Sequence, residues 1–139
     1  MSVTLSKNYY LTLDLGSKLI NFTSDTLKLA FTDTAPTTAT HVYTDIVSPL
    51  ALTNMATSPA LTSVTWTQST GTATLGAATW TGTSQTGNFG PFRYIVIYDD
   101  TAASKNILGW YDYGSEVTLN GANGDQLTIT FGSGLLTLA

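Results

Sequence analysis

The strongest apolar pattern of the chain lies between residues 91 and 113. Apart from Arg93, apolar and aromatic residues occupy positions 92–98, stop at Asp99, Asp100 and Thr101, and resume at 107–111. Runs of this kind, separated by polar turn residues, predict two strands joined by a loop. Because the first run is apolar at nearly every position, neither of its faces is expected to be freely solvated. This predicts a central strand of a packed β-sandwich.

Shorter patterns on both sides of this region predict further strands. Residues 25–31 alternate apolar and polar side chains, which is typical of a strand with one solvated face. Residues 11–20 fit either a strand or a helix, because their leucines alternate and also recur at helical spacing. Residues 37–60 have a weak pattern, and we expect an ordered excursion with one short strand or helical turn near 42–47. Other strands are predicted at 63–68, 72–75, 77–81, 116–119, 126–131 and 135–138, with turns at 69–71 and 120–124 and a loop at 82–90.

These elements predict one domain spanning residues 1–139. About eight or nine short strands with turn signals every 8–12 residues are the spacing expected of a sandwich or jelly roll. The predicted fold is therefore all-β, a jelly-roll-like antiparallel β-sandwich of about eight strands, with room for one short N-terminal helix. Residues 1–10 lie outside the clear strand pattern, so they are expected to form an N-terminal arm.

Composition supports the all-β prediction and excludes several functions. Only 10% of residues are charged, against roughly 25% in typical soluble domains. Threonine, which suits the outward face of a strand, supplies about a fifth of all positions. The net charge of −4 argues against nucleic-acid binding, which needs a basic face. No apolar stretch is long enough for a membrane helix, so we expect no membrane partner.

The start of the chain and the absence of cysteine complete this picture. The first residues, MSVTLSKNYY, lack the apolar core of a signal peptide. We expect the product to be made in the cytosol and kept there until it assembles or is released. Without cysteine there are no disulfides and no thiolate metal sites.

Catalytic chemistry has little support in the sequence. His41 is the single histidine, and no second histidine or cysteine accompanies it in a metal site. We interpret His41 as a polar residue of a loop or strand edge. No G-x-S-x-G elbow, P-loop or H-E-x-x-H pair occurs. We therefore expect no enzyme activity, no metal and no cofactor.

The charged residues near the apolar run have structural and functional interpretations. Asp99 and Asp100 stand at a strand end, where such side chains commonly bond to the backbone of a turn. The alternative is a calcium site that also uses the nearby oxygens of Thr101, Ser104 and Asn106. Asp112 and Glu116 flank a predicted turn at 113–115. Arg93, the sole arginine, is expected either to pair with an acidic neighbour such as Asp112 or to contact another chain.

The aromatic residues raise the possibility of a carbohydrate platform. Exposed rings on a sandwich can stack against sugars, and Trp66, Trp80, Trp110 and Tyr111 are the candidates. All four fall inside predicted strands, where packing in the core is the default use of such residues. Core packing is therefore the preferred interpretation.

Segment 92–113, followed by Gly114, Ser115 and a short strand, resembles a widespread family of small structural proteins of tailed bacteriophages. Members share a block FRYxVxYxDT…xxLIGxxDxG, then a strand pair and an ending similar to GLLTL. The corresponding parts read FRYIVIYDDTAASKNILGWYDYGSEVTL and GLLTL in this chain. The family's SDTLKLAF…DTAP block matches 24–36, and its VTWT segment corresponds to 78–81. Residues 37–62 are least recognisable, and residues 51–60 replace the family's GYTAGG segment.

The resemblance implies a jelly-roll-like sandwich on the outer capsid surface of the virion, made in the host cytoplasm. Several members act as capsid cement or decoration proteins, which bind the major capsid protein and stabilise joints between its subunits. A homo-oligomer, a dimer or a trimer, is expected. The N-terminal arm is the expected attachment element because it combines Lys7 with Tyr9 and Tyr10, and Arg93 is a further candidate contact. The alternatives are a phage tail or fibre component, or a carbohydrate-binding adhesion module.

Overall fold

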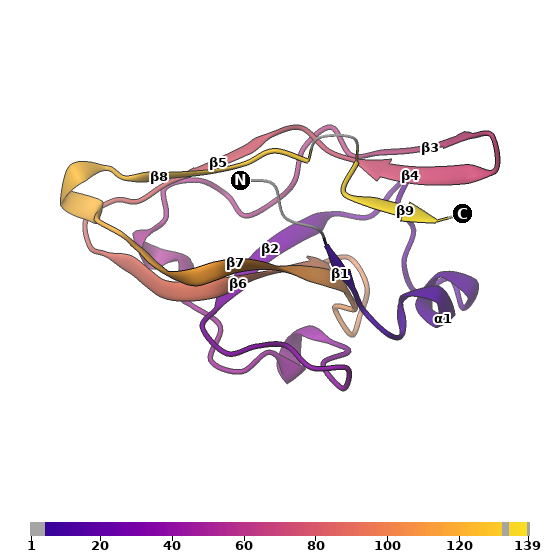
Figure 1. Cartoon of the computed structure of the whole chain (residues 1–139), viewed down its shortest axis with the longest axis horizontal. Helices are drawn as coiled ribbons and strands as arrows, with labels where there is room; N and C mark the ends of the chain where they lie inside the picture. The colour runs from indigo at the N-terminus through magenta and orange to yellow at the C-terminus, as the bar shows by residue number, and fades with distance from the viewer. Residues whose placement is uncertain (1–4, 132–133, 139) are drawn as a thin grey trace.

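The computed structural model describes residues 5–131 and 134–138, which form two facing layers of antiparallel strands (Figure 1). One layer is a four-stranded sheet in the order β1-β7-β6-β2, made of β1 (Ser6–Lys7), β7 (Ile107–Leu119), β6 (Phe89–Asp99) and β2 (Leu27–Thr32). The other layer contains a sheet in the order β3-β4-β9, made of β3 (Thr65–Ser69), β4 (Thr72–Gly76) and β9 (Leu136–Leu138), and a pair of β5 (Trp80–Thr83) with β8 (Gln126–Ile129). One short helix, α1 (Leu11–Gly16), precedes β2. The predicted all-β antiparallel sandwich with a short N-terminal helix is confirmed.

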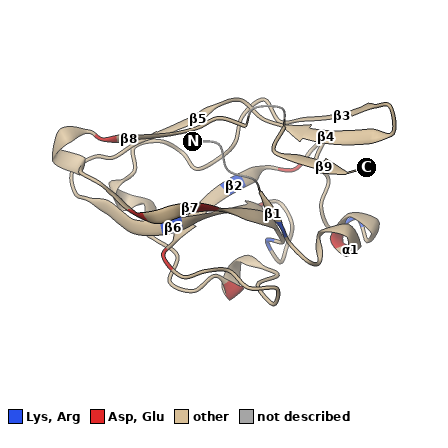
Figure 2. Ribbon diagram, viewed as in Figure 1, with Lys and Arg blue, Asp and Glu red and all other residues tan. Residues whose placement is uncertain are grey.

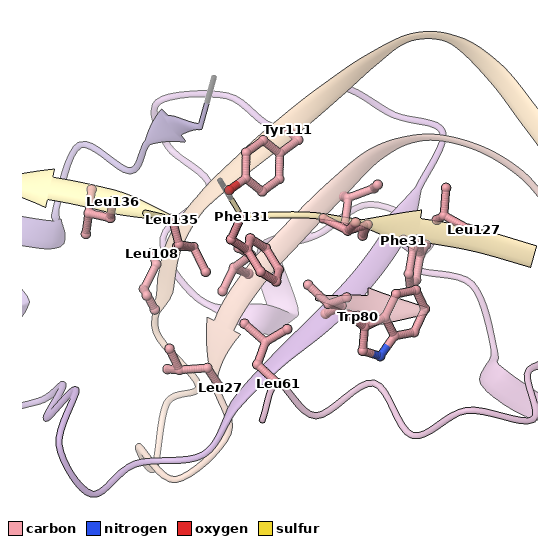
Figure 3. Packing of buried hydrophobic residues seen from close by; sticks show 14 of the residues in the cluster. Leu27, Phe31, Leu61, Trp80, Leu108, Tyr111, Leu127, Phe131, Leu135 and Leu136 are labelled. Carbon is pink, nitrogen blue, oxygen red and sulfur yellow. The ribbon is translucent and has the colours of Figure 1, made fainter. Parts of the chain in front are cut away.

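The main hydrophobic core fills the space between the two layers (Figure 3). The ring of Phe31, from β2, lies in this core with its centroid 5.1 Å from those of both Phe89 and Phe92. Trp80 and Leu127 reach the same core from the opposite layer. Burial of apolar and aromatic side chains from both layers is the main stabilising term of such a sandwich.

A second, smaller cluster covers the outer face of the β6 sheet. Val96, Tyr98 and Ile107 are buried there against Ile46, and the ring of Tyr43 lies 4.8 Å from that of Tyr98. The cover comes from the excursion after β2, in which Tyr43–Asp45 form a 3₁₀ turn. β6 therefore lies inside its sheet with both faces covered, as its apolar run predicts. The prediction of a solvated face on 25–31 is wrong, because the same segment covers β2.

The described part of the N-terminal region forms regular secondary structure, so the prediction of an arm is wrong for these residues. Residues 1–4 lie outside the described residues, but Ser6 and Lys7 pair with Trp110 and Gly109 of β7. The ambiguous segment 11–20 begins as a helix, with Leu11 and Asp14 facing the body of the protein and Leu13 facing solvent. The two buried residues are three positions apart, a spacing that places them on one side of a helix. Of the two interpretations of this segment, the helix is therefore correct for its first part.

The predicted turn at 113–115 and the separate strand at 116–119 are wrong, because β7 runs without interruption from Ile107 to Leu119. Phe92 pairs with Val117 and Tyr94 pairs with Asp112, so Arg93 alone faces four residues of β7. Such an excess of residues on one strand is a β-bulge. Gly114 adopts a φ of +94° within it, a conformation that glycine reaches without strain. The turn-forming residues therefore bend the strand instead of reversing it.

Residues 50–61 run along the outer edge of β2. Leu29 N–H donates to Pro59 O at 2.9 Å, and Leu61 N–H donates to Leu27 O at 2.9 Å. The excursion in the middle of the chain therefore protects this strand edge as well as the sheet face. Within the described ranges, no helix is long and apolar enough to cross a membrane.

Candidate attachment surface

The two sides of α1 have opposite environments. Leu11 and Asp14 are each 1% exposed, whereas Leu13 is 62% exposed. A helix of this length is not stable alone, so its position depends on what its buried side contacts. The buried side carries a carboxylate, and a buried carboxylate needs a partner.

The partner of Asp14 is His41. The imidazole Nε2 of His41 lies 3.0 and 2.9 Å from the two carboxylate oxygens of Asp14. The ring of Tyr10 stacks on the imidazole with a centroid distance of 4.1 Å and an interplanar angle of 25°. The start of α1 is therefore fastened to the excursion after β2 by an electrostatic contact and an aromatic contact.

Two buried asparagines extend this connection to β7. Asn8 donates its side-chain N–H to the carbonyl of Thr40, and its Oδ1 accepts from Tyr10 N–H at 2.8 Å. Asn8 N–H donates to Leu108 O at 2.8 Å. The amide nitrogen of Asn106 lies 3.3 Å from His41 Nε2. The N-terminal segment, the excursion and the β6–β7 hairpin thus meet in one polar cluster.

The polar cluster could in principle serve catalysis, because a histidine oriented by a buried aspartate is part of the serine-hydrolase arrangement. That arrangement also needs a hydroxyl on the other ring nitrogen of the histidine. No hydroxyl of residues 5–131 or 134–138 makes that hydrogen bond. The geometry instead suits a structural role, in which the cluster around Asp14 and His41 connects the N-terminal segment, the excursion after β2 and the β6–β7 hairpin.

Three large apolar side chains are exposed in the segment that carries Asp14. Tyr9 is 76% exposed, Leu13 62% and Leu19 49%. Elsewhere in the described chain only Val47, at 56%, belongs to the same class of exposed side chain. Lys7 is exposed on β1. We call Lys7, Tyr9, Leu13 and Leu19 the N-terminal surface.

The sequence identified part of this surface. Lys7 and Tyr9 are on it, whereas Tyr10 is half-buried against His41 and acts as support. The sequence did not identify Leu13. A leucine in a segment that fits either a strand or a helix is expected to be buried, unless it is known which side of the helix packs against the protein. His41 is a loop residue, as interpreted, but its partner 27 residues away had no signal in the sequence.

Arg93 lies at the bulge of β7 and not on the N-terminal surface. Its Nε and Nη2 donate to the two carboxylate oxygens of Asp112 at 2.7 and 2.9 Å. The guanidinium lowers the pKa of Asp112, and the backbone N–H of Gly114 lowers it further. The expected pairing of Arg93 with Asp112 is confirmed.

Asp99 has the predicted role in a turn, whereas the same prediction for Asp100 is wrong, because its carboxylate pairs with two lysine side chains. Asp99 Oδ1 accepts from the backbone N–H groups of Thr101 and Ala102 at 2.9 and 3.2 Å, and Asp100 lies 2.7 Å from the ammonium groups of both Lys28 and Lys105. Burial, followed by a hydrogen bond to Asp25, raises the pKa of Asp99 to about 7. Within residues 5–131 and 134–138, no three acidic or histidine side chains cluster where they could hold a metal.

The tryptophans do not form an exposed platform. Trp80 is buried, and Trp66 and Trp110 are half-buried against the two hydrophobic clusters. Tyr111, in the same strand as Trp110, is also buried. Core packing, the preferred interpretation, is confirmed for all four aromatic residues.

One hollow of about 320 Å³ opens between residues 34–40 and 45–47. Its only charged lining residue is Asp45. The Asp45 carboxylate already accepts from His41 N–H and Val42 N–H, each at 3.0 Å. The hollow therefore has no free charged group with which to select a ligand.

Comparisons with protein-family models, with curated proteins and with solved structures found no match to this chain.

Proposed function

We propose that the protein is a structural protein of a tailed-bacteriophage virion, a capsid cement or decoration protein. It binds the outer capsid surface and stabilises joints between subunits of the major capsid protein. The observation that carries the proposal is the gathering of exposed Tyr9, Leu13 and Leu19 on a segment fastened by Asp14 and His41. The resemblance of segment 92–113 to phage structural proteins supports the same role.

The physical requirements of cement match these features. Large apolar side chains exposed close together on one segment are a candidate protein-binding surface. The contact between Asp14 and His41 already holds the N-terminal segment in place before binding, so less conformational entropy is lost on attachment. Many copies on a lattice hold through effective concentration, so each contact can be weak. A homo-oligomer, a dimer or a trimer, adds further to this avidity.

The first experiment is attachment to expanded capsids that lack the protein, measured by co-sedimentation. The double variant Tyr9→Ser/Leu13→Ser removes two of the exposed apolar side chains and no buried one. We expect at least a tenfold loss of apparent affinity, which corresponds to about 1.4 kcal/mol. Val47→Ser is the matched control, because Val47 is similarly exposed outside the N-terminal surface. Equal binding by the double variant and the control would overturn the proposed surface.

The second experiment is a cryo-EM map of the particle. Density over the joints between capsid subunits is the expected result. Density confined to the tail would overturn the cement role and favour the tail-component alternative. Removal of residues 2–10 should also abolish attachment, but this deletion includes β1, so the point variants are the sharper test.

A further inference from the structure

The outer edge of β3 is an open strand edge. β3 is the terminal strand of the sheet β3-β4-β9, and β4 is its only strand partner among the described residues. Figure 1 shows the β3–β4 hairpin reaching beyond the other strands at one end of the molecule. The edge of β2, by comparison, is covered by residues 50–61. The backbone groups on the outer side of β3 are therefore available to another strand.

β3 also lacks the features that usually prevent edge-to-edge pairing. Natural edge strands carry charges, prolines or bulges that block a second strand. Thr65–Ser69 contains neither a charge nor a proline, and its five residue pairs with β4 show no register shift. The nearest charged residues along the sequence are Asp45 and Arg93. Figure 2 shows the hairpin free of acidic and basic residues.

The hairpin turn determines which backbone groups point outward. Ser69 pairs with Thr72 across a two-residue turn, Thr70 and Gly71, whose φ values are +48° and +82°. Positive φ at both positions is the type I′ geometry, in which the flanking residues form a hydrogen-bonded pair. Because hydrogen-bonded and non-hydrogen-bonded positions alternate along an antiparallel pair, Thr67 bonds to β4. The N–H and C=O groups of Trp66 and Gln68 then face the open edge.

We propose that a second copy of this chain pairs with this edge, with the two β3 strands antiparallel about a two-fold axis at Thr67. Trp66 then faces Gln68 of the partner subunit, and each such pair exchanges two N–H···O hydrogen bonds. The pairing joins two β3-β4-β9 sheets into one continuous sheet. It is closed and isologous, the commonest symmetry of soluble homo-oligomers.

The chemistry of β3 favours a second copy as the occupant of this edge. The five residues form the same neutral sequence on both sides of the axis, so no like charges oppose one another. Thr67 faces Thr67 of the partner subunit, and cross-strand threonine pairs stabilise sheets. Trp66 is half-buried, with its ring 4.8 Å from that of Phe22. Its diagonal neighbour is Trp66 of the partner subunit, at a separation that aromatic side chains can reach.

The dimer does not depend on the capsid role, since β3 and the N-terminal surface are separate elements of the chain. Solution measurements without capsids test the dimer alone. A failed dimer therefore leaves the attachment proposal standing, and a failed attachment leaves the dimer standing.

A cysteine cross-link tests the register. The chain has no cysteine, so Thr67→Cys introduces a single thiol. In a non-hydrogen-bonded antiparallel pair the two Cα atoms are about 4.5 Å apart, which is within the range of a disulfide. Thr137→Cys is the matched control, because Thr67, Thr74 and Thr137 form one row across the sheet and Thr137 is exposed on its opposite edge strand.

With oxidised glutathione as oxidant, we expect a covalent dimer of Thr67→Cys and a monomer of Thr137→Cys on non-reducing gels. A folded Thr67→Cys variant that stays monomeric would overturn the register, and so would equal cross-linking of both variants.

A charge at the axis tests the interface without a covalent bond. Thr67 is exposed, so Thr67→Lys should fold while placing two ammonium groups opposite each other in the dimer. Light scattering after size exclusion should give a dimer for the wild-type chain and Thr137→Lys, and a monomer for Thr67→Lys with an unchanged circular dichroism spectrum. A monomeric wild-type chain, or a dimeric Thr67→Lys variant, would overturn the proposal.

Discussion

The buried carboxylate of Asp14 lies 2.9 Å from Nε2 of His41, a contact that joins the N-terminal helix to a loop 27 residues further along the chain. Tyr10 stacks on the same imidazole. Leu13 is on the opposite side of the helix and faces solvent. The contact between Asp14 and His41 therefore helps to hold the surface to which we assign attachment in place.

His41→Ala should destabilise the fold by about 1–3 kcal/mol, because it leaves the Asp14 carboxylate buried without its partner. Urea unfolding at pH 7 measures the change. Asp14→Asn alone should also destabilise, but adding His41→Ala to it should cost much less than His41→Ala costs in the wild type. Strictly additive free energies in this double-mutant cycle would show that the two residues are not energetically coupled.

Asp99→Asn should stabilise the protein at pH 8, by on the order of 2 kcal/mol. The pKa of Asp99 is raised from 3.8 to about 7, so between these pH values the folded state binds a proton that the unfolded state has released. Wild-type stability therefore falls as the pH rises through this window. Asparagine keeps the oxygen that accepts from Thr101 and Ala102, and its amide can donate to Asp25, so Asp99→Asn should show little of this decline.

The control for this pH dependence is Asp100→Asn. The pKa of Asp100 is lowered by Lys105 and Lys28, so its charged form stabilises the fold above its ordinary pKa. Asp100→Asn should therefore lose stability at both pH 5 and pH 8 in urea unfolding. If Asp99→Asn behaved like Asp100→Asn, the charged form of Asp99 would stabilise the fold, which would contradict its raised pKa.

Gly109→Ala should displace β1. A Cβ at this position would meet the carbonyl oxygen of Ser6 and lie 3.1 Å from Cγ of Leu5. We expect a loss of about 1–3 kcal/mol and faster hydrogen exchange at Asn8 N–H, which bonds to β7. Gly16→Ala is the matched control, because a Cβ there meets nothing within 4 Å. An unchanged exchange rate at Asn8 in a folded Gly109→Ala variant would contradict the pairing of β1 with β7.

Arg93→Ala should have only a small effect on stability, since both side chains of the Arg93–Asp112 pair are substantially exposed and solvent screens the pair. Thermal unfolding in low and high salt measures the contribution, which should shrink as salt screens the pair. Loss of capsid attachment without loss of stability would instead identify Arg93 as a contact residue.

The sequence by itself determined the class of fold and most strand positions, because apolar periodicity and turn residues act over a few neighbouring positions. It also indicated that Arg93 would pair, that Asp99 would form a turn, and that residues 92–98 would be covered on both faces. These outcomes depend on local chemistry or on the total apolar content of one strand.

Only the tertiary structure decided what depends on distant contacts. Residues 113–115 look like a turn locally, but pairing of Val117 with Phe92 converts them into a bulge. Leu13 and Leu11 are identical residues two positions apart, yet only Leu11 is buried, as is Asp14, whose carboxylate contacts His41. The open edge of β3 likewise appears only when the strand order is known. Edge position and the burial of an isolated residue depend on which distant segments pack against it, so neither can be predicted from the neighbouring residues alone.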